Sequence, residues 1–238
     1  MTTGLIKGLL VPALAGLLSL SAGTAWASTI TFDLLGPNGD IQPYPGPYAK
    51  VTVTTASDPS TTATITFESY TSGSLYTYLF GDGGSVGVNV NATSWTLGTI
   101  TGSNSGTGFT PGPYSDGGVG NEDGFGVFNQ KINSFDGYTH SSDLISFTLT
   151  NLSGTWLDAS DVLIANDDGL MAAAHIFVCD GTGSNCNAKN PALRTGFAAG
   201  NGTPLPPPDV PPGTIPEPSS MLLLGTGLVG LARRFRRS

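Results

Sequence analysis

The chain contains little positive charge, and nearly half of it lies at the C-terminus. Nine Lys and Arg face 17 Asp and Glu in 238 residues, and four of the nine lie within residues 233–238. Between residues 28 and 215, four cationic side chains remain against sixteen carboxylates, a formal balance of −12. Nucleic acids are bound through clustered cations. The composition therefore excludes nucleic-acid binding and disfavours contact with anionic lipid.

Histidine and cysteine are also scarce. His140 and His175 are the only histidines, and neither accompanies the nucleophile elbow of a hydrolase or the second histidine of a zinc motif. His175 lies at the start of an alternating run, which favours a structural or surface role. No catalytic site can be found in the sequence. We therefore expect a protein that is not an enzyme and that has no cofactor.

Cys179 and Cys186 are the only cysteines, with six residues between them. In an exported protein, such a pair typically forms a disulfide. We predict a Cys179–Cys186 bond that closes a small loop. A metal site is the alternative, but two thiolates with no neighbouring histidine make a weak one.

The C-terminal tail combines three different pieces. Pro216-Glu217-Pro218 precedes an apolar segment at residues 221–232, and a basic cluster follows it, formed by Arg233, Arg234, Arg236 and Arg237. A bilayer-spanning helix needs about 20 apolar residues, so this segment is short for a permanent anchor. The arginines would stay on the cytoplasmic side. Short tails of this kind are typical of sorting signals that are later cut, whereas a buried C-terminal helix is the alternative.

This tail resembles the PEP-CTERM sorting signal, in which a Pro-Glu-Pro motif precedes a short apolar segment and a basic cluster. The resemblance covers about a tenth of the chain. It implies processing near Pro216-Glu217-Pro218 by exosortase, a membrane-embedded protease-transpeptidase of Gram-negative bacteria, after transient residence in the inner membrane. Bacteria with this system typically export polysaccharide and form biofilm.

The N-terminus also predicts export. Lys7 is followed by an apolar stretch at residues 8–20 and by Ala25-Trp26-Ala27. A basic start, an apolar middle and an Ala-x-Ala site are typical of a secretory signal peptide. We predict export through the Sec translocon, with cleavage between Ala27 and Ser28. An N-terminal membrane anchor is the alternative.

The predicted organisation is a signal peptide at 1–27, one β domain at 28–202, a Pro-rich linker at 203–215 and the sorting signal at 216–238. Apolar and polar residues alternate with period two in the β domain, which indicates half-buried strands. The runs lie at residues 28–34, 49–53, 63–67, 86–90, 145–149 and 176–178.

These runs, with Gly- and Pro-rich turns between them, predict an all-β fold: an antiparallel, jelly-roll-like β-sandwich flanked by a signal helix and a short C-terminal transmembrane helix. The apolar phase shifts between Val127 and Phe128, which predicts a β-bulge. Residues 101–124 hold eight glycines and two prolines, so we expect a long surface loop there.

The carboxylates offer one candidate metal site. Glu122 and Asp123 lie in a Gly-rich segment with the oxygen-bearing groups that calcium prefers. The spacing matches no complete calcium loop, and a solvated turn is the alternative. A glycosidase would need two carboxylates at a set separation across a cleft, which spacing along loops cannot establish.

Two functions remain open. The first is a non-enzymatic protein of the envelope or extracellular matrix, associated with biofilm and exopolysaccharide. The second is a carbohydrate-binding module or weak polysaccharide-active enzyme on the same scaffold. Exposed aromatics on a concave sheet would favour the second, and a face of small polar residues the first. Trp95, Trp156, Tyr44, Tyr48 and Tyr114 could either stack on sugars or fill the core.

Overall fold

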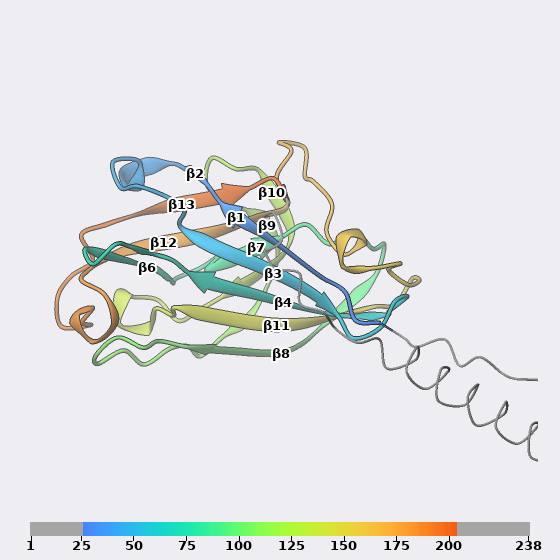
Figure 1. The fold of residues 1–238 in the computed structure, drawn as a ribbon, viewed down its shortest axis with the longest axis horizontal. Helices are drawn as coiled ribbons and strands as arrows, with labels where there is room; N and C mark the ends of the chain where they lie inside the picture. Colours follow the sequence, from blue (N-terminus) through green and yellow to red (C-terminus); the bar gives the residue numbers. More distant parts are fainter. Residues whose placement is uncertain (1–25, 204–238) are drawn as a thin grey trace, which may run out of the picture. The chain divides into compact units, whose positions relative to one another are not determined.

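The computed structural model describes residues 26–203, which form two antiparallel sheets packed face to face (Figure 1). The predicted signal helix, apolar segment and arginine cluster lie outside the described residues. The first sheet, sheet A, has five strands that lie side by side in Figure 1. Their order is β1 (Thr29–Leu34), β3 (Ala49–Thr55), β4 (Thr62–Ser69), β11 (Leu144–Asn151) and β8 (Trp95–Ser103).

The second sheet, sheet B, has eight strands. The main order is β2 (Gly36–Pro37), β13 (Arg194–Gly200), β12 (Ala172–Asp180), β7 (Val86–Val88), β10 (Val127–Asn133) and β9 (Ser115–Asn121). β6 (Tyr76–Phe80) pairs with the C-terminal half of β12, on the same side as β7, and β5 (Thr71–Ser72) pairs with β6. Helix in the described residues is limited to four single 3₁₀ turns, η1 (Gly39–Ile41), η2 (Tyr138–His140), η3 (Ala159–Asp161) and η4 (Gly183–Asn185).

The main core lies between the sheets and is built from the apolar members of the alternating runs. Phe32, Val51, Ile65 and Phe147 point inward from sheet A and meet residues such as Val178 of sheet B, all fully buried or nearly so. The alternation therefore predicted the buried face of β1, β3, β4 and β11 in sheet A correctly. The all-β antiparallel sandwich is confirmed for the described residues.

One detail of the predicted fold is wrong. Residues 101–124 are not one long loop, since β8 continues to Ser103 and β9 forms a second strand. Both are edge strands that pair on one side only, so they need fewer apolar residues than a central strand.

The predicted bulge is present in β10, although a few residues later than expected. The register of β10 with β9 shifts between Phe128 and Lys131 and again before Ile132. A larger break separates β6 from β7, which both pair with β12. Residues 81–85 loop out there opposite a single residue, His175, whose backbone N–H donates to Ser85 O and whose carbonyl accepts from Gly81 N.

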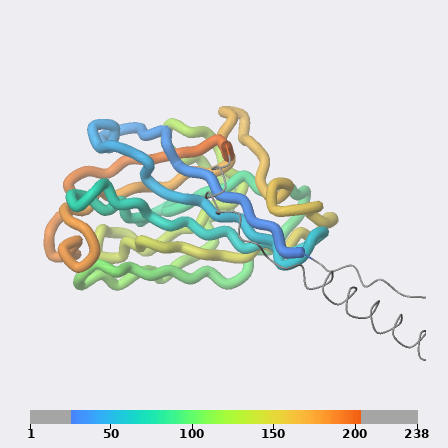
Figure 2. Tube along the Cα trace, in the orientation of Figure 1, coloured from blue at the N-terminus to red at the C-terminus, as the bar shows by residue number. Residues whose placement is uncertain are grey.

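The two ends of the sandwich carry different loops. Figure 2 shows the connection from β11 to β12, in gold, at one end, and the connection from β12 to β13, in orange, at the other. The first contains η3, and the second contains η4 and Cys186.

Candidate functional site

The outward side of sheet A is lined almost entirely by threonine and serine, and we call it the threonine face. Because the strands are in register, the outward residues form rows that cross the sheet. The first row contains Thr29, Thr54, Thr64, Thr148 and the bulged pair Gly98 and Thr99; the second contains Thr31, Thr52, Thr66, Ser146 and Thr101; the third contains Thr62, Thr150 and Thr96.

Most hydroxyls of the threonine face are available to solvent or to a partner. Two cross-strand pairs bond to each other, Thr29 with Thr54 at 3.1 Å and Thr66 with Ser146 at 3.0 Å. In residues 26–203, the hydroxyls of Thr31, Thr52 and Thr64 have no hydrogen-bond partner. Neighbouring strands lie about 4.8 Å apart. The face thus offers hydroxyl and methyl groups at regular spacing, without aromatic rings.

The only charges on the threonine face form a row at one end. Asp33, Lys50 and Glu68 lie opposite one another on β1, β3 and β4. Lys50 Nζ is 2.6 Å from Glu68 Oε2, and both side chains are partly exposed, so this ion pair contributes little stability. Tyr70 donates to Asp33 Oδ1 at 3.0 Å. Burial, together with this bond, raises the pKa of Tyr70 to about 12.

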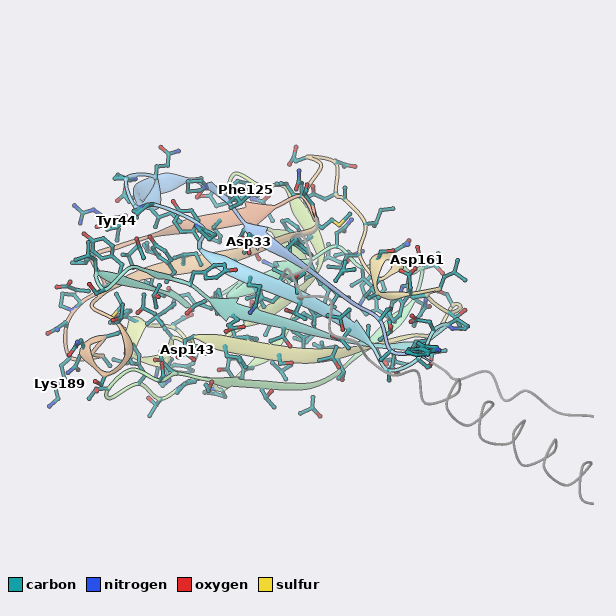
Figure 3. The ribbon with its side chains drawn as sticks, in the orientation of Figure 1. Asp33, Tyr44, Phe125, Asp143, Asp161 and Lys189 are labelled. Atoms are coloured by element: carbon teal, nitrogen blue, oxygen red, sulfur yellow. A yellow bond between two sulfur atoms is a disulfide. The ribbon has the colours of Figure 1, made fainter. Side chains whose placement is uncertain are left out.

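A hollow of about 470 Å³ lies beside this charged row. Most of the residues that line it have polar side chains, although carbon atoms make up most of its exposed surface: Glu68, Ser69, Thr71, Thr77, Ser103, Asn104, Ser105, Asp143, Leu144 and Gly183. Asp143 accepts from Ser105 N at 2.7 Å and from Ser105 Oγ at 2.5 Å. Figure 3 places Asp143 toward the same end of the sandwich as Lys189. Both carboxylates of the hollow have protein partners, Lys50 for Glu68 and Ser105 for Asp143.

The outward side of sheet B differs, because loops cover it. One apolar cluster contains Leu79, Phe177, Cys179 and Cys186, and a second contains Phe128, Ala173 and Ala199. His175 stacks on Phe197, with ring centroids 4.5 Å apart, and its Nε2 is 2.7 Å from Thr195 Oγ1. Burial lowers the pKa of His175. These contacts agree with a structural histidine.

The two calcium candidates do not point to one site. Glu122 is 1% exposed, and its Oε1 has no hydrogen-bond partner within residues 26–203. Lys131 Nζ lies 4.0 Å from that oxygen. Burial raises the pKa of Glu122 to about 8, an effect that Lys131 opposes. Asp123 is exposed instead, and its backbone carbonyl accepts from Asn38 Nδ2.

The described part of the chain contains no group of three or more His, Cys, Asp and Glu side chains that could hold a metal. The sequence did not reveal that Glu122 is buried, because its neighbours are typical of a turn.

The aromatic residues considered for sugar stacking serve the core. Trp156 and Tyr48 are buried, and Trp95 Nε1 donates to Gln130 Oε1 of β10 at 2.9 Å. Tyr114 Oη lies 2.6 Å from Ser142 Oγ, and Tyr44 packs edge-on against another tyrosine. The alternative in which these side chains fill the core is therefore confirmed.

The predicted disulfide is also confirmed. Cys179 and Cys186 are bonded, with Cα atoms 5.7 Å apart. This distance lies within the range of roughly 4.4–6.8 Å for disulfides. The bond joins β12 to the loop after it, within the apolar cluster that contains Leu79 and Phe177.

Comparison with known proteins locates one motif, outside the described residues. Residues 214–237 match the PEP-CTERM protein-sorting motif. The chain ends in a PEP-CTERM sorting signal. This stretch contains Pro216-Glu217-Pro218 and all four terminal arginines, so the PEP-CTERM signal implies an exported protein that passes through the membrane and has exosortase as its processing partner. No curated protein and no solved structure matches the chain.

In residues 26–203, no helix has the length and apolar character required to cross a membrane.

The threonine face itself was not anticipated, although the sequence contains its signal. Each alternating run of sheet A has threonine or serine at most of its polar positions, as in Thr52 and Thr54 of β3 or Thr64 and Thr66 of β4. The missing information was the register, which aligns these positions into rows.

Proposed function

We propose that the mature domain is a non-enzymatic protein of the cell envelope or extracellular matrix, and that its threonine face contacts neutral exopolysaccharide of a biofilm. The observation that supports this proposal is the threonine face, which is a large, regular surface of hydroxyl groups with charge confined to one end. Sugar hydroxyls are both donors and acceptors, and so are threonine hydroxyls.

Each such contact replaces a bond to water and contributes little by itself. A long polymer that engages several rows at once would gain from multivalency. The balance of −12 in the mature region would repel an acidic polymer, which favours a neutral one.

Export and processing follow from the tail. In this proposal the arginines hold the C-terminus at the cytoplasmic side, while Pro216-Glu217-Pro218 stays extended outside the apolar segment, because proline fixes φ and removes a backbone donor.

We expect replacement of Pro216-Glu217-Pro218 by three alanines to leave an uncleaved precursor in the inner membrane. Replacement of Pro206-Pro207-Pro208 in the linker by alanine is the matched control and should be processed normally. Mass spectrometry of extracellular protein with a C-terminus at Ser238 would contradict the sorting mechanism.

Polysaccharide contact is tested by co-sedimentation of the processed protein with neutral extracellular polysaccharide. The double substitution Thr64→Glu with Thr148→Glu places two carboxylates in the first threonine row and should reduce the sedimented fraction by at least about fivefold, because a charge must be desolvated on contact. Thr139→Glu with Thr155→Glu adds the same charge at exposed positions off the face and should sediment like the unchanged protein. Equal loss in both variants, or no binding by the unchanged protein, would contradict the proposal.

A second candidate, a carbohydrate-binding module that takes a short sugar, is supported by the 470 Å³ hollow with its hydroxyl lining and the carboxylates of Glu68 and Asp143. Binding of a short oligosaccharide that is lost with Asp143→Ala but kept with Thr64→Glu would favour this candidate.

A further inference from the structure

The strand β8 is a free edge of sheet A. It pairs with β11 on one side, and no strand among the described residues pairs with it on the other. Leu152 N donates to Ser94 O at 2.9 Å. Because backbone groups alternate in direction along an antiparallel strand, those of Thr96 point toward β11 and those of Trp95 and Leu97 point away. Leu97 therefore has a backbone donor and acceptor directed toward solvent.

A bulge in β8 changes this alternation half-way along the strand. Gly98 and Thr99 together oppose the single residue Thr148, because the pairing steps from Leu149 with Leu97 to Phe147 with Ile100. The extra residue shifts the phase by one, so the backbone groups of Ile100 and Gly102 also point away from β11. The side chains follow the same shift, and Leu97 and Ile100 both pack on the core.

The other sheet edges have features that protect against pairing with another chain, and β8 has fewer of them. Natural edges are short, charged, irregular or contain proline. β9 contains Asp116, has Gly118 at φ +57° and pairs irregularly with β10. β2 has two residues, one of them proline, and β1 has six with one Asp. β8 has nine residues with neither charge nor proline, although its bulge is itself an irregularity.

The bulge makes β8 complementary to a second copy of itself. If two β8 strands pair antiparallel about a two-fold axis between Gly98 and Thr99, Leu97 of one copy lies opposite Ile100 of the other, and Thr96 lies opposite Thr101. Inward residues then meet inward residues, and outward residues meet outward ones. In a strand without a bulge, a two-fold axis between adjacent residues would place the inward side chains of one copy opposite the outward side chains of the other. The solvent-directed backbone groups of Leu97 and Ile100 would face each other as hydrogen-bonded pairs.

We propose that β8 is a self-association edge, through which two copies of this chain join their A sheets into one continuous ten-stranded sheet. The threonine face of one copy then continues onto the next. Neither β8 nor its neighbour β11 contains a charged residue. The negative charges of two paired domains would therefore lie away from the paired edge, and salt screens the repulsion between them. The inference goes beyond the proposed function and does not depend on polysaccharide binding.

Cysteine cross-linking tests the register. Thr96→Cys and Thr101→Cys are made in separate chains, and each processed protein is purified from the extracellular fraction. Thr96 and Thr101 would form a non-hydrogen-bonded pair with Cα atoms about 4.5 Å apart, which is within disulfide range. Under mild oxidation, an equal mixture should give cross-linked dimers, and either variant alone should give at least about tenfold fewer, because its two cysteines lie several residues apart. Absence of cross-linking in the mixture, or equal cross-linking by one variant alone, would overturn the inference.

Sedimentation equilibrium provides a second measurement. Thr99→Lys places two like charges beside the two-fold axis and should raise the dimer dissociation constant at least about tenfold. Thr148→Lys makes the same change one strand further in, on an exposed side chain of the same row, and should leave dimerisation within about twofold. An unchanged protein that stays monomeric at all concentrations would refute β8 pairing. If that monomer still sediments with polysaccharide, the proposed function stands and only the association edge fails.

Discussion

The outer faces of the two sheets differ in what their side chains contact. On sheet B, outward residues such as Phe177 and Ala173 lie under loops and form two small apolar clusters. On sheet A, outward residues such as Thr52 and Thr64 are covered by nothing among residues 26–203 and contribute little to packing. The outward residues of sheet B are therefore part of the folded interior. Those of sheet A are available to a partner, and this is why we place the functional surface there.

The difference is already present in the strand sequences. β12 contains apolar residues at both inward and outward positions, and seven of its nine residues are buried. β3 alternates without interruption, and its outward residues Lys50, Thr52 and Thr54 are only half-buried. A sheet covered on both sides needs the first kind of strand, and a sheet open on one side needs the second.

The largest expected difference between the two faces is in how the free energy of unfolding depends on pH. Burial raises the pKa of Glu122 from 4.5 to about 8. Between these values, unfolding releases a proton, so the free energy of unfolding should fall as pH rises. From pH 5 to pH 8 we expect a loss on the order of 3 kcal/mol, measured by denaturant melts at each pH.

Glu122→Gln should remove most of this pH dependence, since the amide does not ionise. Glu68→Gln on the threonine face is the matched control, and its side chain is 53% exposed. If the pH dependence survives in Glu122→Gln and disappears in Glu68→Gln, the contrast between buried and open faces is wrong for these carboxylates.

A pair of neighbouring glycines makes a finer test of packing above sheet B. Gly84 has φ +67°, and a Cβ added there would lie 2.5 Å from Glu122 Oε1. We expect Gly84→Ala to lower the free energy of unfolding by about 1–3 kcal/mol, from backbone strain and from this contact. At Gly83 an added Cβ meets nothing within 4 Å, so Gly83→Ala should change stability by less than about 0.5 kcal/mol. Equal thermal and urea midpoints for the two variants would show that the residues above Glu122 are not closely packed.

The sequence predicts the open face better than the covered one. Sheet A was largely found from alternation, because one side of β1, β3, β4 and β11 is solvated and their period of two is unbroken. β8 was not found, since its bulge breaks that period. β9 was missed, since its glycines and Asp116 resemble a loop and only pairing with β10 makes it a strand. The burial of Glu122 was missed for a similar reason, as it depends on residues 81–85 and Lys131 from other parts of the chain. The sorting signal needed no folding information, because its motif is contiguous.

The smallest effect should come from the threonine face. Thr64→Ala with Thr148→Ala removes two facing side chains from the middle of the first row. Neither hydroxyl has a hydrogen-bond partner within residues 26–203, so the main loss is the strand preference of threonine over alanine, about 0.5 kcal/mol per site. We expect the urea midpoint to shift only slightly, while co-sedimentation with neutral polysaccharide falls several-fold. A loss of more than about 2 kcal/mol would mean that the face is a structural element of the fold. Full stability together with unchanged co-sedimentation would leave the face without a role in binding, and the contrast between the two sheets would then concern packing alone.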